Sequence, residues 1–127
     1  MEFFAKVDNR GIDSNTLFDR LTIDVLPEFS PSIDKVLTIS SSLKGEIYSI
    51  WGQFEVSREK IRNGVRFALL NCPHAFAWTI AVHDHLDVLV VHCTIDKEEE
   101  DREFVESIQQ FVADLAQSLA VKLVAIE

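Results

Sequence analysis

The sequence predicts an α+β domain of two layers, in which a long C-terminal helix covers an antiparallel β-meander of about four strands, with one or two N-terminal helices. Residues 46–95 contain several segments rich in β-branched and aromatic side chains, which is typical of strands. Residues 104–119 instead repeat apolar side chains every three or four positions, as an amphipathic helix does. The length of 127 residues fits one domain, residues 1–127, since domains usually have roughly 100–200 residues.

The N-terminal helix follows a short apolar opening at residues 3–4 and a turn. Asp13 or Ser14 can cap this helix, because short polar side chains bond the free N–H groups of a first turn. Pro27 limits it, since proline cannot continue a helix interior. Its apolar face consists of Leu17, Phe18, Leu21 and Val25. We therefore expect one helix before residue 27.

Residues 30–42 allow two interpretations. Ser30 followed by Pro31 is typical of a helix start, with proline at the first helical position. Residues 36–39 are also β-prone, which favours a strand. The serines at 40–42 end the segment in either case, so helix and strand both stay open.

The predicted meander begins at residue 46. Residues 46–56 form one strand that can bend at Gly52. Residues 57–64 favour a hairpin, because Asn63 and Gly64 are a preferred central pair of a type I′ turn, although a short helix capped by Ser57 is the alternative. Further strands are expected at residues 65–70, 75–82 and 88–95. Short connections between successive strands predict antiparallel pairing.

The strand at 75–82 divides into a large and a small face. Phe76 and Trp78 lie on the large face, whereas alanines and Thr79 lie on the other. We expect the small face to seat the C-terminal helix, with a ligand cleft or a second subunit as alternatives. Trp51, Phe76 and Trp78 are the candidate residues of an apolar ligand cleft.

The C-terminal helix begins at Asp96 or a neighbouring acid. Its first turns carry an acidic run at residues 98–103, where negative charge complements the positive end of the helix dipole. Residues 121–126 are apolar and are expected to form a short last strand, either in the same sheet or exchanged with a second chain.

Charge and hydropathy narrow the class of function. Acids outnumber bases by 21 to 12, which gives a formal charge of −9. Such a field repels phosphate backbones and anionic membrane surfaces, so we expect neither nucleic acid nor a membrane as a partner. The apolar runs fall short of the roughly 20 residues that span a bilayer, and the N-terminus does not resemble a secretory signal. We expect a cytoplasmic protein with free thiols at Cys72 and Cys93.

A basic patch stands out on this acidic chain. It comprises Arg58, Lys60, Arg62 and Arg66. These residues are a candidate partner-binding surface, because arginine offers paired donors to a carboxylate or phosphate. The alternative is an edge strand that its charges protect against unwanted pairing.

All four histidines lie between residues 74 and 92, and imidazole and carboxylate side chains alternate in part of this segment. His83, His85 and Asp87 occupy a predicted loop, where imidazole and carboxylate can converge on zinc or iron, with His92 as a further ligand. Over five residues the pattern resembles the metallo-β-lactamase-type hydrolase motif, whose next histidine is missing here. The alternative is a polar turn whose side chains bond the backbone.

No catalytic residue is assigned from the sequence. Phosphate loops, zinc ribbons and nucleophile elbows are missing from it. Alternation points His92 and Cys93 to opposite faces of a strand, so these neighbours cannot form a nucleophile–base pair, and Cys93 is expected to be buried.

The sequence therefore favours a small acidic protein-binding or adaptor module without catalytic activity that binds a second copy of itself, as a homodimer, or another protein. The alternative is a metal-dependent or acid–base enzyme with its site at the His83–Asp87 turn. A third hypothesis is a carrier that binds a small ligand at the aromatic cleft. The cofactor, if one exists, is unknown from the sequence.

Overall fold

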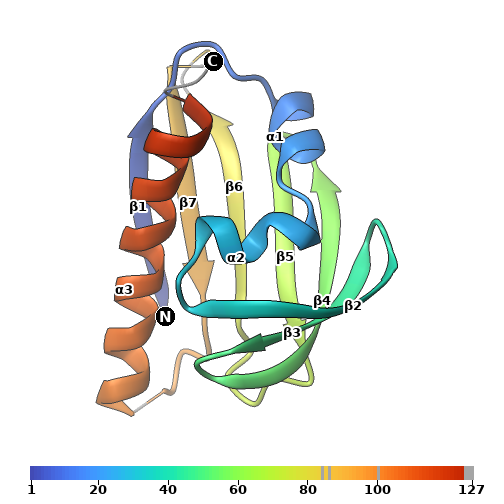
Figure 1. Ribbon diagram of the computed structural model, residues 1–127. Coiled ribbons are helices and arrows are strands. Elements are labelled where there is room, and N and C mark those ends of the chain that lie inside the picture. Colours follow the sequence, from blue (N-terminus) through green and yellow to red (C-terminus); the bar gives the residue numbers. More distant parts are fainter. Residues whose placement is uncertain (84, 86, 100, 125–127) are drawn as a thin grey trace.

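A curved antiparallel sheet and a long C-terminal helix form the two layers of the structure (Figure 1). The computed structural model describes residues 1–83, 85, 87–99 and 101–124. The seven strands are β1 (Glu2–Asp8), β2 (Ile33–Ser41), β3 (Lys44–Ser49), β4 (Gly52–Ile61), β5 (Gly64–Leu70), β6 (Ala77–His83) and β7 (Val88–Thr94). Their order is β1-β7-β6-β5-β4-β3-β2, so β2 to β7 form an antiparallel meander and β1 is added beside β7. The sequence predicts this meander only from residue 46 onward. The expected count of about four strands is too low.

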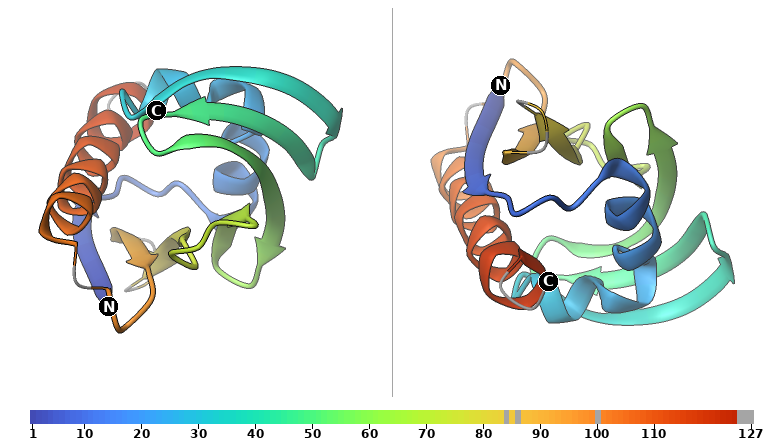
Figure 2. Two further views of the ribbon diagram at one scale, coloured as in Figure 1. Left: turned by 90° about the horizontal axis from the view of Figure 1, so that it is seen from below. Right: turned by 90° about the horizontal axis from the view of Figure 1, so that it is seen from above.

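The helices lie on the concave side of the sheet (Figure 2). They are α1 (Ser14–Arg20), a single 3₁₀ turn (Ile23–Val25), α2 (Leu26–Phe29), α3 (Arg102–Leu119) and a wider helical turn (Ala120–Val124) that continues α3. No helix in the described part of the chain is long and apolar enough to cross a membrane.

Strands β1 and β2 account for much of the miscount. In β1, Phe3 and Val7 face inward while Lys6 faces out, and the strand pairs with β7, which is distant in the sequence. Such pairing leaves no local signal beyond a few alternating residues. Of the two alternatives for residues 30–42, the strand is correct: the β-prone residues lie in β2, and Ser30 does not start a helix. Pro31 lies just before the strand.

The N-terminal helix is shorter than expected. Asp13 caps it, since its carboxylate accepts a hydrogen bond from the Thr16 N–H at 2.8 Å. The helix ends at Arg20, and Pro27 lies in the first turn of α2. Proline is favoured there because that turn needs no N–H from it. Pro27 therefore starts a second short helix and does not limit the first.

The single strand expected over residues 46–56 is two strands joined by a tight turn. The Ser49 hydroxyl accepts from the Trp51 N–H at 3.2 Å and donates to the Gly52 carbonyl at 2.8 Å. Gly52 has φ 123°, a conformation that glycine adopts without strain. The turn was missed because its central residues, Ile50 and Trp51, are themselves typical of strands.

The predicted hairpin over residues 57–64 is confirmed, with its turn one residue earlier than expected. Ile61 pairs with Gly64, so Arg62 and Asn63 form the turn, and neither has a positive φ. Gly64 is the first residue of β5. A Cβ there would lie 1.9 Å from the Ile80 carbonyl oxygen, so the close approach of β6 requires glycine at this position.

Helix α3 covers the sheet as predicted, but on the large face of β6. The ring of Phe111 lies 5.1 Å from that of Trp78, whereas Ala77 and Ala81 face the outer side of the sheet. Burying the larger apolar side chains removes more surface from water, which decides the orientation. The buried side of α3 comprises Phe104, Ile108, Phe111, Val112, Leu115 and Leu119.

Both ends of the C-terminal segment differ from expectation. Asp101, and not Asp96, caps α3 through a hydrogen bond from the Phe104 N–H at 3.3 Å. Residues 121–124 continue the helix, so the expected strand at 121–126 is wrong over this part, and its last two residues lie outside the described structure. Leu123 and Val124 are buried, and a helical turn buries them without a partner strand.

Candidate functional site

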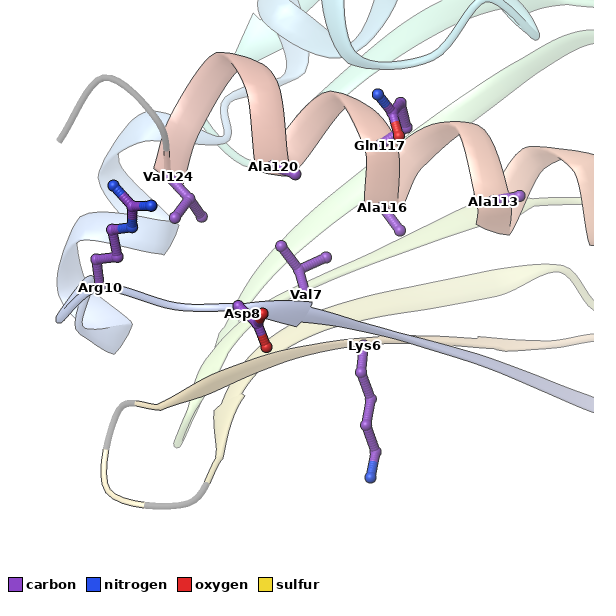
Figure 3. A pocket seen from close by; sticks show the side chains of 9 residues that line it. All are labelled: Lys6, Val7, Asp8, Arg10, Ala113, Ala116, Gln117, Ala120 and Val124. Carbon is purple, nitrogen blue, oxygen red and sulfur yellow. The ribbon is translucent and has the colours of Figure 1, made fainter.

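A groove of about 410 Å³ runs between β1 and the C-terminal part of α3 (Figure 3). Its apolar walls are Val7 on the strand and the alanines and valine of the helical segment, Ala113, Ala116, Ala120 and Val124. The groove exists because alanine side chains are too short to fill the space between α3 and β1, which leucine side chains would fill. The sequence analysis missed it, since helical alanines leave no mark in the hydrophobic pattern.

The charged residues along the groove point in different directions (Figure 3). Lys6 and Asp8 extend to the far side of the strand, away from α3, as alternation along β1 requires. Arg10 lies beyond the end of β1, and its side chain runs toward Val124. The Arg10 guanidinium has no ion-pair partner among the described residues. A cation therefore stands at one end of a groove that has apolar side chains on both walls and the polar Gln117 on the helix side.

The other part of α3 packs against aromatic rings of the sheet. The predicted cleft residues do come together, with ring centroids 4.8 Å apart for Trp51 and Phe76 and 5.4 Å apart for Phe76 and Trp78. Phe111 of α3 contacts all three. Phe76 and Trp78 are each only 1% exposed, so these rings form a filled core. The Trp78 indole N–H has no hydrogen-bond partner within the described structure.

Polar tethers hold the same half of α3. The Trp51 indole N–H donates to the Ser107 hydroxyl at 2.9 Å. His74 bonds the Glu99 carboxylate through Nδ1, and its ring stacks on Phe104 at 3.8 Å. The pKa of Glu99 is lowered, first by the backbone N–H that it accepts from the α3 cap and then by His74. In the sequence Glu99 stands out only as part of an acidic run, and nothing there links it to His74, which lies 25 residues earlier.

The four predicted metal ligands are spread along β6 and β7. His83 ends β6, His85 and Asp87 lie in the connection, and His92 is four residues beyond Val88 on β7, or about 13 Å at the usual rise of a strand. His92 instead stacks on Phe4 and contacts a Glu2 carboxylate oxygen at 2.9 Å. No group of three His, Cys, Asp or Glu among the described residues is placed to hold a metal. Metal binding at the turn stays a prediction.

Arg58 is not part of a surface patch. It is 4% exposed and lies against Phe18 at 3.8 Å. Its guanidinium donates to the carbonyls of Leu21 at 2.9 Å and Ser42 at 3.0 Å, and to that of Phe18. Burial lowers its pKa, and two nearby carboxylates oppose that shift. Alternation with the buried Val56 was the signal in the sequence that Arg58 points inward.

The other three basic residues do not share one face. Lys60 donates to the Asn15 side chain at 2.8 Å on the concave side. Arg66 lies on the outer face, 3.4 Å from the Glu59 carboxylate, and Arg62 is exposed in the turn between β4 and β5. The structure therefore does not assemble the four residues into one binding surface.

The cysteines follow the sequence prediction where the structure tests it. Both thiols are free. Cys93 is buried on the inner face, opposite to His92, and burial raises its pKa to about 12. A thiol with so high a pKa is a poor nucleophile.

The fold resembles several solved structures. The protein XoxI from Bacillus cereus has a TM-score of 0.66 and 14% identity, over 98% of this chain and 96% of that one. A START superfamily protein from Mycobacterium smegmatis has a TM-score of 0.64 and 10% identity, over 100% and 98%. Ara h 8.0201 has a TM-score of 0.59 and 10% identity, over 98% of each chain. No family model and no curated protein matches the sequence. These likenesses show a START/Bet v1-like fold.

Proposed function

We propose that this protein is a non-catalytic binding protein that takes a small molecule with an apolar body and an acidic group. The groove between β1 and α3 carries the proposal. Its volume of about 410 Å³ lies within the range of roughly 300–1,000 Å³ that small-molecule sites usually have. A molecule lying along Val7 and Ala116 brings its acidic end to Arg10.

The chemistry of the groove supports this ligand class. Each methylene that leaves water for the apolar walls contributes about 0.8 kcal/mol. Arginine pairs with a carboxylate through two parallel hydrogen bonds, which are stronger than bonds between neutral groups. The resemblance to START/Bet v1-like folds, which are ligand-binding folds, supports a binding role as well.

A groove-filling variant tests the proposal. Decanoate serves as the probe, and calorimetry or native mass spectrometry measures its binding. Ala116→Phe places a ring in the groove and is expected to weaken binding at least tenfold, whereas Gln109→Phe adds the same ring at an exposed position of α3 outside the groove. Equal binding by both variants and the wild type would refute the groove as the site.

The charge at the end of the groove is tested separately. Arg10→Gln is expected to weaken decanoate about tenfold and to leave decanol unchanged, because only the acid forms a charge-assisted hydrogen bond. Lys6→Gln is the matched control, since it removes the same charge from a side chain that points away from α3. If Lys6→Gln weakens decanoate as much as Arg10→Gln does, Arg10 does not hold the acid.

A second candidate function is that of an acidic, homodimeric protein-binding or adaptor module in the cytoplasm. The observation that favours it is a group of exposed apolar side chains at the edge of the sheet, with Leu37 38%, Ile39 52% and Leu43 48% exposed. Sedimentation tests it, because Ile39→Lys should shift a wild-type dimer to monomer. A wild type that is already a monomer at high concentration would leave no role for self-association. The expected lack of nucleic-acid and membrane partners stays a prediction.

A further inference from the structure

We propose that the outer face of the sheet carries a second binding site, for a phosphate-class oxyanion, separate from the groove. A hollow of about 140 Å³ lies there. It is lined by Arg66, Ala77, Trp78, Thr79, His92 and Thr94. These residues supply a guanidinium, two hydroxyls and an imidazole, and none of the lining residues is a carboxylate.

The sheet register places the donors in one row. Arg66 of β5 is opposite Thr79 of β6, which is opposite His92 of β7. Neighbouring strands lie about 4.8 Å apart, so the three side chains span roughly 10 Å, a distance over which they can converge on one small anion. In the next row Ala77 pairs with Thr94. The side chain of Ala77 is too short to fill the space beside Thr94, and this leaves the hollow. The small side chains of β6 would then form the floor of the proposed site.

Two carboxylates hold the side chains at the ends of this row. Glu59 lies 3.4 Å from Arg66, and Glu2 lies 2.9 Å from His92. The Glu59–Arg66 pair is exposed, and such pairs are weak in water. The guanidinium has five N–H donors, and its contact with Glu59 accounts for only one of them. An oxyanion can therefore bind beside Glu59 without displacing it.

Phe4 supplies an apolar surface next to the hollow. Its ring stacks on His92 with centroids 4.4 Å apart and planes 6° apart, and it is 62% exposed. The stack fixes the plane of the imidazole. It also offers a place for the organic part of a phosphate ester, so the same hollow suits free phosphate or a phosphomonoester.

The experiment is an NMR titration of the whole protein with inorganic phosphate, at ionic strength held constant with sodium chloride. Saturable shifts are expected at the amides of residues 66, 79, 92 and 94. Arg66→Gln and His92→Gln should each raise the Kd at least tenfold. Arg62→Gln is the matched control, because it removes the same charge from the exposed turn of the same hairpin. Shifts that do not saturate, or an equal loss in Arg62→Gln, would overturn the site.

A variant that is expected to bind phosphate more tightly excludes misfolding as the explanation, because a misfolded protein would bind more weakly. Glu59→Gln removes a negative charge that lies 3.4 Å from Arg66 and repels an anion bound there, so phosphate should bind about threefold tighter. Glu55→Gln changes the same charge on the outer face of the same strand, opposite Leu70 and away from Arg66, and should leave the Kd unchanged. Equal tightening in both would indicate only a general reduction of negative charge and would count against the site.

Phenyl phosphate distinguishes the two sources of the anion. If it binds several-fold tighter than inorganic phosphate, and Phe4→Ala abolishes the difference, the site takes a phosphate ester. Equal Kd values for both probes would assign it to free phosphate. Ala116→Phe should change neither titration, because the groove lies on the other face of the sheet. A change there would contradict two separate sites.

Discussion

The two halves of α3 contact the same sheet in different ways. The part of α3 up to Phe111 packs Phe104 and Phe111 into the aromatic core and is tethered by Trp51 and His74. The part after Phe111 also buries Leu115 and Leu119 in the core, but it faces β1 with alanines and leaves the groove. The difference shows that one helix can both fix its position on the sheet and form one wall of a binding site. The size of the side chains on each turn decides whether the space between helix and sheet is filled or left open.

The largest effect should come from the anchored half. Phe111→Ala removes a fully buried ring that contacts Trp51, Phe76 and Trp78, so we expect the free energy of unfolding to fall by about 3–5 kcal/mol. Urea denaturation measures it. A loss below about 1 kcal/mol would mean that the core relaxes into the space, and the contrast between the halves would be much weaker.

The polar tether of the anchored half should contribute less. Trp51→Phe keeps an aromatic ring but removes the hydrogen bond to Ser107, and we expect a loss of about 1 kcal/mol. Ser107→Ala removes the other partner and should cost a similar amount. In a double-mutant cycle the two losses should not add, since they delete one bond. Additive losses would show that the bond carries no free energy.

The groove half should tolerate change better. Ala116→Gly deletes only a methyl that faces the groove, so the expected loss is the roughly 1 kcal/mol that glycine costs in a helix. The same urea experiment measures it. A loss comparable to that of Phe111→Ala would mean that this half is packed as tightly as the other and that the groove is not open space.

The smallest effect concerns pH. The pKa of Glu99 is lower in the folded protein than in the unfolded chain, so its contribution to stability is complete above the unfolded value and is lost as pH falls through the folded value. The Tm of the wild type should exceed that of Glu99→Gln at neutral pH, and the difference should shrink and then vanish as the pH falls below the ordinary pKa range of a glutamate. A difference that grows in acid would contradict this sign.

Much of the fold could be predicted from the sequence, because local periodicity marks α3 and the strands at residues 65–70, 75–82 and 88–95. Strand β1 could not, since its pairing with β7 joins residues that are far apart in the sequence, such as Glu2 and Thr94. The turn at Ile50 and Trp51 was hidden because it is built from residues typical of strands.

Less of the candidate site could be predicted. The aromatic residues of the expected cleft were correctly grouped, but a sequence does not show whether grouped rings enclose space or fill it. The groove depends on alanines, which carry no chemical signal. Arg58 was misplaced because charge was weighed above alternation, although Val56, two residues before it, indicated an inward-pointing side chain.

The buried guanidinium of Arg58 also limits which sequences can adopt this structure. It joins carbonyls at the end of α1 to one in the β2–β3 turn, so two segments distant in the chain share one donor group. The three N–H donors of lysine all lie on one nitrogen, whereas the donors of arginine are spread over a planar guanidinium. Lysine therefore cannot bond the same three carbonyls. In evolutionary terms position 58 should exchange with neither lysine nor any neutral residue unless α1 and that turn change together, and a library of variants selected only for folding would show this coupling.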